Sequence, residues 1–345
     1  MIGIAVVGYG YWGPNLVRNF SETKGARLIK VCDLRKDRLV TMQERYPAVE
    51  ITDDFDEVLS DPRIDAIAIA TPVSTHFRLA LKALMAGKHV FVEKPMAATA
   101  DEAQRLVDEA ARRRLVLAVD HTFVHTGAVR KMRELVESGL GEMYYYDSVR
   151  VNLGLFQHDV SVIWDLAVHD LSIMDYVLRE KPVAVSATGM SHVAGEPANI
   201  AYLNLFFESN LIAHIHVNWL APVKVRRTLI GGSQKMIVYD DLEPSEKIKV
   251  YDKGITLNGN PQKNGEKVYQ MLVGYRTGDM WAPQLDATEA LGVELRQFVD
   301  CIEQNGTPIA DGHAGLRVVR ILEAATQSLA QRGRVIDLEP VRWVA

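Results

Sequence analysis

The sequence predicts an α/β fold in which an N-terminal Rossmann domain, with a doubly wound parallel sheet, precedes an α+β domain with a large, mostly antiparallel sheet. Three observations predict it. Strand-like and helix-like segments alternate up to Asp120, a glycine-rich turn follows the first strand, and longer alternating strands begin after Asp120. Such alternation is typical of βαβ units, whose right-handed crossovers give a parallel sheet.

The elements of the first domain follow from short apolar runs and from capping residues. Strands are expected at 2–7, 27–32, 66–70, 90–92 and 115–119, and helices at 15–20, 35–45 and 74–85. Thr99 and Glu102 form a T-x-x-E capping box, which predicts a helix reaching about Arg113.

The second domain is expected to begin with a helix over 128–138 that ends at Gly139. Strands are expected at 142–153, 184–190, 201–207, 211–219 and 226–230, helices near 289–303 and 315–332, and a hairpin or loop over 251–268. Apolar residues alternate with His214, His216 and Asn218 in 211–219, which is typical of a half-buried antiparallel strand. The predicted domains are 1–122 and 123–345.

Composition limits the classes of function. The 345 residues are 48% hydrophobic and 24% charged, with a formal net charge of −5 and no dense Lys/Arg block, which argues against wholesale disorder and against nucleic acid as a partner. Cys32 and Cys301 are too few for a disulfide framework. With no signal-peptide pattern after Met1, and an apolar stretch at 209–223 too short for a membrane span, the expected location is the cytoplasm.

A dinucleotide site is predicted at the first turn. Gly8-Tyr9-Gly10-Tyr11-Trp12-Gly13 is a G-x-G-x-x-G between the first strand and a helix, where glycine permits a tight turn and close approach to a pyrophosphate. Asp33 lies 20 residues after Gly13, at the end of the second strand, where its carboxylate can accept the ribose hydroxyls and repel a 2′-phosphate.

This pattern favours NAD over NADP as the cofactor. Leu34, next to Asp33, is included in the predicted cofactor site. Arg35 and Lys36 leave NADP open, because either cation could reach a 2′-phosphate, although both could equally lie on a solvated helix start.

Further motifs follow in order along the chain. Thr71 and Pro72, with His76, come after one strand; Glu93-Lys94-Pro95 comes after the next; and Asp165 precedes His169 by four residues in the second domain. With the glycine turn, they resemble the family of glucose–fructose oxidoreductase, inositol dehydrogenase and rhizopine catabolism proteins over essentially the whole chain. The resemblance implies that Lys94 lies beside the nicotinamide and the reacting hydroxyl, and that His169 is the proton donor or acceptor.

The chemistry of these residue types agrees with that expectation. Oxidation of a secondary alcohol requires a base for the hydroxyl proton, and a neutral histidine is suited to this role. Asp165, one helical turn before His169, could orient the imidazole, and Lys94 could stabilise a developing alkoxide. The alternatives are a surface lysine, a satisfied core histidine and a carboxylate that complements a helix dipole. His76 is expected to pack near the nicotinamide rather than to exchange protons.

The substrate is expected to be a sugar. The run 152–159, which begins at Asn152, and the following run 164–170 resemble members that oxidise the 3-hydroxyl of UDP-N-acetylglucosamine or its uronic acid. Lys224, Arg226 and Arg227 could meet a diphosphate or could be solvated strand charges. The alternatives are a free polyol or monosaccharide dehydrogenase, with keto-sugar reduction as a possible direction, and a non-catalytic NAD-binding regulator.

Two further expectations concern partners. His214 and His216 form an H-x-H pattern, but no third ligand accompanies them at a telling spacing, so no metal site is predicted. The alternating strand 211–219 and the resemblance predict self-association through the second domain, as a homodimer or homotetramer.

Overall fold

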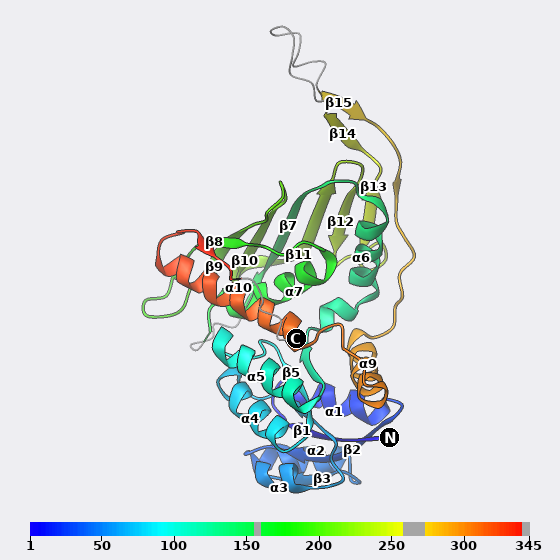
Figure 1. Cartoon of the computed structure of the whole chain (residues 1–345), viewed down its shortest axis with the longest axis vertical. Helices are drawn as coiled ribbons and strands as arrows, with labels where there is room; N and C mark the ends of the chain where they lie inside the picture. Colours follow the sequence, from blue (N-terminus) through cyan, green and yellow to red (C-terminus); the bar gives the residue numbers. More distant parts are fainter. Residues whose placement is uncertain (155–159, 258–272, 340–345) are drawn as a thin grey trace. The chain divides into compact units, whose positions relative to one another are not determined.

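The computed structural model (Figure 1) describes residues 1–154, 160–257 and 273–339. The chain folds into two compact units, one of Met1–Thr126 with Ala287–Glu323 and one of Gly127–Asp286 with Ala324–Ala345. The first boundary lies close to the expected one near 122. The segment Ala287–Glu323, which the sequence places in the second domain, packs with the first unit.

The first unit contains a six-stranded parallel sheet in the order β3-β2-β1-β4-β5-β6. This is the strand order of a Rossmann fold, in which β2 and β3 lie on one side of β1 and β4, β5 and β6 lie on the other, so the strand order reverses between β1 and β4. Its strands are β1 (Ile2–Val7), β2 (Ala26–Cys32), β3 (Glu50–Thr52), β4 (Ala66–Ile69), β5 (His89–Glu93) and β6 (Leu117–Asp120).

Helices connect these strands. They are α1 (Gly13–Glu22), α2 (Lys36–Arg45), α3 (Phe55–Ser60), α4 (Val73–Met85) and α5 (Ala100–Arg113), followed by the 3-10 helix η1 (Thr122–His125). The side chain of Thr99 caps α5 by accepting a hydrogen bond from the Glu102 N–H at 3.2 Å, as the capping box predicts. The short strand β3 and the helix α3 were not expected, because runs of three and six residues show no clear periodicity.

Helix α9 (Ala290–Gln304) completes the core of the first unit although it follows the second unit's sheet in sequence. Phe298 of α9 packs on Phe91 of β5, with ring centroids 5.5 Å apart, and Phe91 meets Phe20 of α1 edge-on at 6.3 Å. All three rings are fully buried, so the apolar face of α9 covers the face of the sheet on which α1 lies.

The second unit is built on a nine-stranded sheet in the order β16-β13-β12-β11-β7-β10-β9-β8-β17. The strands are β7 (Met143–Leu153), β8 (Ala184–Met190), β9 (Ile200–Phe206), β10 (Ile212–Asn218), β11 (Leu220–Gly232), β12 (Met236–Asp240), β13 (Ile248–Tyr251), β16 (Met280–Trp281) and β17 (Ile336–Asp337). Neighbours are antiparallel except β10 and β7, which run parallel, so the sheet is mixed and strand 211–219 is antiparallel on one side only.

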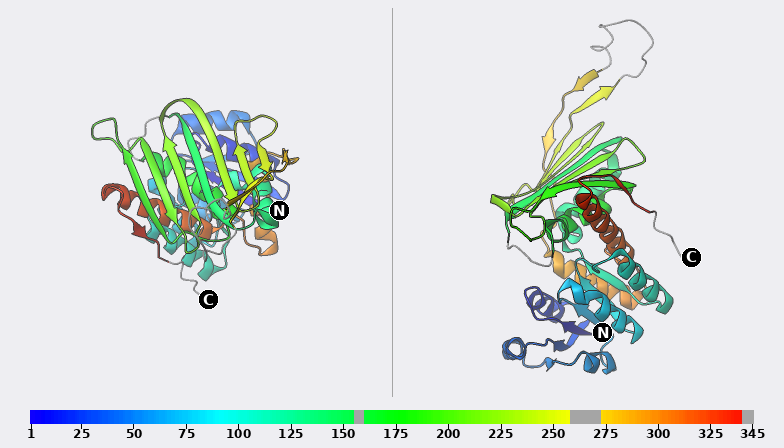
Figure 2. Two further views of the ribbon diagram at one scale, coloured as in Figure 1. Left: turned by 90° about the horizontal axis from the view of Figure 1, so that it is seen from above. Right: turned by 90° about the vertical axis from the view of Figure 1, so that its left-hand side faces the viewer.

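Helices lie against one face of this sheet. They are α6 (Gly127–Gly139), the π-helical turn η2 (Ile163–Ala167) with α7 (Val168–Val177), and the end of α10 (Gly312–Ala330), which begins in the first unit. The opposite face carries no helix within the described residues (Figure 2). A hairpin of β14 (Gly254–Leu257) and β15 (Val273–Arg276) brackets residues 258–272, so most of the predicted loop 251–268 lies outside the described residues.

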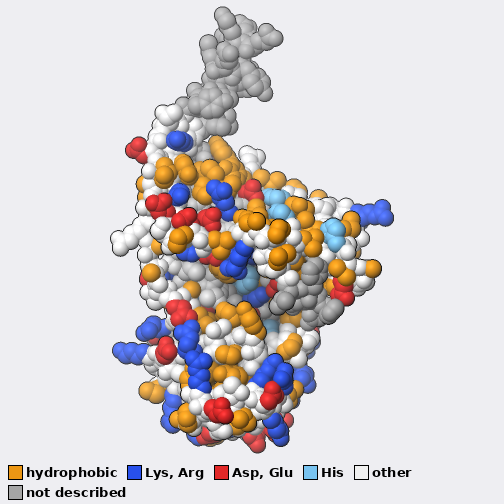
Figure 3. Space-filling model, turned by 180° about the vertical axis from the view of Figure 1, so that it is seen from behind, with side chains coloured by type: hydrophobic (Ala, Val, Ile, Leu, Met, Phe, Trp, Pro, Cys, Tyr) orange, Lys and Arg blue, Asp and Glu red, His pale blue; other side chains and the backbone are white. Residues whose placement is uncertain are grey.

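On β10 the predicted alternation is confirmed. Ala213, Ile215 and Val217 are fully buried on the helix-covered face, whereas His214 and His216 lie partly exposed on the other. Hydrophobic and histidine side chains gather on the uncovered side of the second unit (Figure 3). Tyr202 and Ile212 belong to this surface, with exposed fractions of 37% and 46%. Among the described residues, no helix is long and apolar enough to span a membrane.

Candidate functional site

The glycine turn lies at the carboxyl end of β1, beside the point where the strand order reverses. Gly8 has φ +97°, and a Cβ there would stand 2.5 Å from the Ala70 carbonyl oxygen. A Cβ on Gly13 would lie 2.1 Å from the Gly8 carbonyl oxygen, where α1 begins. Only glycine therefore fits at either position, so the turn packs closely against β4 and against the start of α1.

Asp33 follows β2 and faces this turn. Its Oδ2 accepts a hydrogen bond from the Tyr9 backbone N–H at 2.7 Å, and its Oδ1 accepts one from the Arg35 N–H at 2.8 Å. Each carboxylate oxygen has a second lone pair, so both can still accept a ribose hydroxyl. The carboxylate thus stabilises the turn and remains a suitable adenosine contact.

The cations near Asp33 differ from those that the sequence singled out. Arg35 pairs with Asp37 at 2.8 Å and Lys36 with Asp53 at 3.1 Å, so both have carboxylate partners of their own. The cation nearest to Asp33 is Arg38, whose Nη1 lies 3.9 Å from Asp33 Oδ2. A Cβ on Gly10 would stand 3.4 Å from the same Arg38 nitrogen. Arg38 was missed because a solvated helix normally carries such charges.

Tyr11 and Leu34 flank the turn with almost fully exposed side chains, at 94% and 86%. Large apolar side chains exposed beside a glycine turn are suited to contact a bound planar group. Together with the closely packed glycines and Asp33, they fit a dinucleotide at this edge of the sheet.

Thr71, Pro72 and His76 lie where β4 passes into α4. The His76 ring is 1% exposed, and its two nitrogens each lie 2.8 Å from a carbonyl oxygen, Nδ1 from that of Pro95 and Nε2 from that of Thr71. His76 therefore links the turn after β4 to the Glu93-Lys94-Pro95 turn after β5. Burial lowers the pKa of His76, although both carbonyl contacts oppose this shift.

Lys94 follows the last residue of β5 and is partly exposed. Because Glu93 pairs with Asp120 across β5 and β6, Lys94 is placed one residue beyond the end of the neighbouring strand. In the first unit the structure thus brings the glycine turn, Asp33, the Thr71 turn and Lys94 to the same end of one parallel sheet. The sequence predicted this set of residues.

A buried polar cluster behind this edge was not predicted. Trp12 of the glycine turn donates its indole N–H to Asp120 Oδ2 at 2.6 Å, and Glu294 of α9 also faces Asp120. One signal was present in the sequence, because Glu294 falls on the same helical face as the apolar Leu291 and Leu295.

In the second unit, Asp165 and His169 lie on consecutive helical turns. Asp165 belongs to the π-helical turn η2, and its Oδ2 accepts a hydrogen bond from the Trp219 indole at 3.1 Å. Trp219 is 1% exposed, so this bond fixes the carboxylate against the sheet. His169, in the first turn of α7, is partly exposed.

The residue after His169 anchors α7 to the sheet. Asp170 is 2% exposed and accepts hydrogen bonds from Arg150 Nε and Ser148 Oγ, each at 2.6 Å. Arg150 and Ser148 are themselves buried on β7. A buried ion pair with this many hydrogen bonds holds the helix that carries His169 in one orientation.

The other residues predicted to meet the substrate lie near the end of β7 and on β11. The Asn152 amide donates to the Leu153 carbonyl at 3.3 Å, and Arg226 pairs with Asp241 at 3.2 Å. Lys224 and Arg227 are exposed on β11. Residues 155–159 of the run used for the substrate prediction lie outside the described residues.

The H-x-H pair packs with an aromatic ring. Tyr202 stacks on His216 with centroids 4.4 Å apart, and His214 Nδ1 lies 3.2 Å from Asp147 Oδ1. Within the described residues, no three His, Cys, Asp or Glu side chains are grouped so that they could hold a metal ion.

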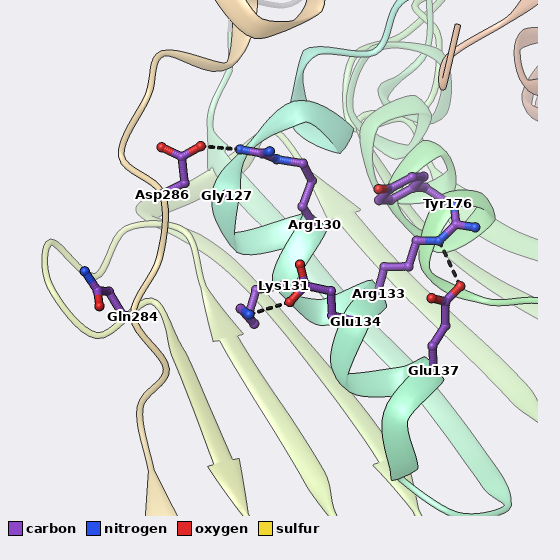
Figure 4. A pocket seen from close by; sticks show the side chains of 9 residues that line it. All are labelled: Gly127, Arg130, Lys131, Arg133, Glu134, Glu137, Tyr176, Gln284 and Asp286. Carbon is purple, nitrogen blue, oxygen red and sulfur yellow. Dashed lines mark hydrogen bonds and ion pairs between the residues drawn. The ribbon is translucent and has the colours of Figure 1, made fainter. Parts of the chain in front are cut away.

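A polar pocket is lined by α6, by Tyr176 of α7 and by Gln284 and Asp286 (Figure 4), and it contains none of the predicted site residues. Its charges are largely paired with one another, as in Arg130–Asp286 at 2.6 Å and Arg133–Glu137 at 3.1 Å. Because these side chains neutralise each other, the pocket offers no unbalanced charge to a charged ligand.

Residues 2–121 match the family model of the oxidoreductase family with an NAD-binding Rossmann fold, and residues 129–238 match the GFO/IDH/MocA C-terminal domain. A UDP-N-acetylglucosamine 3-dehydrogenase of Acidithiobacillus ferrooxidans is 29% identical, covering 78% of this chain and 81% of its own. A myo-inositol 2-dehydrogenase of Thermotoga maritima is 24% identical, covering 98% and 99%.

Solved structures agree on the fold. A structure of the Acidithiobacillus ferrooxidans UDP-N-acetylglucosamine 3-dehydrogenase superimposes with a TM-score of 0.81 at 24% identity, covering 96% of this chain and 98% of its own. GenD2 from gentamicin A biosynthesis, in complex with NAD, gives a TM-score of 0.82 at 22% identity, covering 98% and 97%. The predicted fold class, a parallel Rossmann sheet followed by a second, mostly antiparallel sheet, is confirmed.

Proposed function

Because the chain belongs to the GFO/IDH/MocA oxidoreductase family and its first unit is an NAD-binding Rossmann domain, we propose that it oxidises a secondary hydroxyl on the sugar of a nucleotide sugar. A substrate of the UDP-N-acetylglucosamine type, reacting at its 3-hydroxyl, is the leading candidate. Dehydrogenase activity itself follows from the family and from relatives that are named dehydrogenases.

The observation that carries the choice of substrate is the identity to the UDP-N-acetylglucosamine 3-dehydrogenase. It reaches 29% over 276 residues, against 24% for the myo-inositol and scyllo-inositol 2-dehydrogenases. The exposed cations Lys224 and Arg227 are suited to bind a diphosphate, which gives the nucleotide-sugar substrate further support.

His169 is proposed as the proton acceptor. The partly exposed ring lies in a helix that the buried Arg150–Asp170 pair anchors, so its position is constrained while solvent can still receive the proton. Asp165, held by Trp219, places a negative charge one turn earlier, which would favour the imidazolium that forms during the reaction.

Lys94 is proposed to donate a hydrogen bond to the same substrate oxygen. An ammonium group there stabilises negative charge as the proton leaves, which lowers the barrier without itself removing a proton. When bound, NAD supplies the acceptor for the hydride; Gly8, Gly13 and Asp33, with the exposed Tyr11 and Leu34, would hold it.

A panel of substrates tests the proposal. The purified protein with NAD is assayed for NADH formation with UDP-N-acetylglucosamine, its uronic acid, free N-acetylglucosamine, glucose and myo-inositol. A UDP-sugar is expected to give the highest kcat/KM. Equal turnover of the free sugar and its UDP form would contradict a nucleotide-sugar site.

A free-polyol dehydrogenase is the second candidate. The inositol dehydrogenase of Thermotoga maritima aligns with 98% of this chain, more than the nucleotide-sugar relative does. If myo-inositol gives the highest kcat/KM in the panel, this candidate replaces the first, while the roles proposed for Lys94 and His169 remain.

A further inference from the structure

Asp120 is a buried carboxyl group that contacts the glycine turn. It ends β6, is 2% exposed, and accepts hydrogen bonds from Trp12 Nε1 at 2.6 Å and from Thr122 Oγ1 at 2.5 Å, one on each oxygen. An indole N–H can only donate, so the oxygen that faces Trp12 must act as an acceptor. Both contacts are satisfied best by an ionised Asp120.

Glu294 places a second buried carboxyl group against the first. It projects from α9, is 4% exposed, and faces Asp120 and Glu93, with His125 Nε2 3.6 Å from its Oε1. Burial, followed by the charge of Asp120, raises the pKa of Glu294 well above its usual value. Burial also raises the pKa of Asp120, against its two hydrogen-bond donors and the positive charge of Lys94.

Two adjacent buried carboxyl groups are not both ionised near neutral pH, because the second negative charge would be repelled in a medium that screens it poorly. The surroundings decide which group keeps the proton. Asp120 has the donors Trp12 and Thr122 and the cation Lys94 to favour its charge. Glu294 faces the further acid Glu93. The charge of Glu294 is favoured by the His121 backbone N–H and, when protonated, by His125, and these do not outweigh its burial and the charge of Asp120. The proton therefore resides on Glu294, and the charge on Asp120.

The Asp120 carboxylate lies beside two parts of the proposed site, the glycine turn and the strand end that precedes Lys94. Asp120 pairs in register with Glu93 across the β5–β6 ladder, and Lys94 is the next residue. The same carboxylate binds Trp12, inside the G-x-G-x-x-G turn. One buried group thus contacts the cofactor turn and acts on the lysine that is proposed to bind the reacting hydroxyl.

We propose that Asp120 and Glu294 share a single proton, and that the resulting Asp120 carboxylate is a positioning residue that holds Trp12 of the glycine turn and sets the placement of Lys94. The link to catalysis rests on the proposed function, because it assumes the role of Lys94. The shared proton does not rest on the proposed function, and it is tested without any substrate. Ionisation of Glu294 at alkaline pH would set two like charges against each other and weaken both contacts.

Infrared spectroscopy tests the shared proton directly. The wild-type protein at pH 7 to 8 should show the carbonyl stretch of a protonated carboxyl group, and Glu294→Gln should lose it. Glu303→Gln, on the more exposed part of the same helix at 41%, is the matched control and should keep the band. A wild-type spectrum without that band above pH 7 would overturn the proposal, and this measurement does not depend on any variant folding.

Unfolding by urea at several pH values gives an independent reading. In the folded protein Glu294 keeps its proton at pH values where the unfolded carboxyl has lost it. The contribution of Glu294 to stability therefore falls as the pH rises above 4.5, the usual pKa of a glutamate side chain. The unfolding equilibrium constant of the wild type relative to Glu294→Gln should therefore increase by about tenfold per pH unit until Glu294 itself ionises. A pH-independent ratio would contradict the shared proton.

Asp120→Asn tests the positioning role, because asparagine keeps the shape and an acceptor for Trp12 but removes the charge. NAD affinity should change little, whereas kcat on the identified substrate should fall roughly tenfold or more with a changed pH profile. If the infrared band is present but kcat and its pH profile are unaltered, Asp120 does not position Lys94. Absence of NAD-dependent activity with every substrate tested would count against the proposed function and leave the infrared result standing.

Discussion

The backbone N–H of Tyr9 donates to the Asp33 carboxylate at 2.7 Å, so the residue expected to select the cofactor also holds the glycine turn in place. This double role changes how Asp33 should be tested. Removing the whole side chain would alter the turn together with the charge, whereas asparagine can keep an acceptor for Tyr9 and remove the charge alone.

We therefore predict that the wild type binds NAD more tightly than NADP. Asp33→Asn should reduce the ratio of the two affinities by about tenfold, which corresponds to about 1.4 kcal/mol of lost repulsion. Asp33→Ala should weaken the binding of both cofactors, because Tyr9 loses its acceptor. Titration of the wild type and of both variants with NADH and NADPH, followed by nicotinamide fluorescence, measures the six affinities. Equal NADH and NADPH affinities in the wild type would reject Asp33 as the selector.

His76 gives a second prediction. Its buried ring lies between the carbonyl groups of Thr71 and Pro95 and, when neutral, donates its one N–H to one of them, so His76→Leu removes a buried hydrogen bond and should cost about 1–3 kcal/mol in the free energy of unfolding. Because the pKa of His76 is lowered, the folded state binds fewer protons than the unfolded state below about pH 6.5. Wild-type stability should therefore lose the contribution of His76 as pH falls below 6.5.

Urea unfolding of the two proteins between pH 5 and 8 checks both statements. The exposed Lys36, on another helix of the same unit, provides a control, and Lys36→Gln should leave stability within about 0.5 kcal/mol. A His76→Leu protein as stable as the wild type at pH 8 would show that the two carbonyl contacts contribute nothing net.

The Arg150–Asp170 pair gives a third prediction. Asp170→Asn leaves the buried Arg150 guanidinium without its counter-charge and should cost about 3–5 kcal/mol in the free energy of unfolding. Glu137→Gln breaks the exposed Arg133–Glu137 pair in the same unit and should cost less than about 1 kcal/mol. Chemical denaturation of both variants compares them, and similar losses would mean that the buried pair has no special stabilising role.

Self-association is a fourth prediction, because we propose that two copies pair through the uncovered face of the second sheet. Tyr202 and Ile212 are large apolar side chains exposed on that face, and a second copy would shield them from water. Light scattering at micromolar concentration should give at least a dimer mass, and Ile212→Asp should lower it. Val40→Asp, at an exposed apolar residue of the first unit, is the control, and a monomeric wild type would exclude the pairing.

The sequence predicted most of the first unit because its signals are local. The glycine turn, the Thr99 cap and the apolar strands each depend on a few consecutive residues, and the structure contains all three. What it could not predict depends on contacts between distant segments. The packing of Phe298 on Phe91 brings α9 back to the first unit, and no local pattern reports such a return.

The second sheet shows the same limit. The alternation in 211–219 identifies which side chains of β10 are buried, but it does not distinguish a parallel from an antiparallel neighbour. The two-residue strands β16 and β17 are too short to show any period. In the site, Asp120 and Glu294 are 174 residues apart in sequence and meet only after folding.

The central claim is that His169 removes the hydroxyl proton while Lys94 binds the same oxygen. With the best substrate of the panel, His169→Asn should lower kcat by roughly 10²–10⁴-fold and Lys94→Ala should also lower it strongly, with NAD affinity nearly unchanged for His169→Asn. The wild-type kcat should rise with pH as the imidazole loses its proton, and this rise should be absent in His169→Asn.

The double variant is the most direct test of that claim. Because both side chains are proposed to act on one oxygen in one step, kcat of the His169→Asn, Lys94→Ala protein should be little lower than that of the poorer single variant. It is measured as NADH formation at saturating NAD for the four proteins under one set of conditions. Losses that multiply in the double variant would show that the two residues act independently, and would contradict a shared hydroxyl.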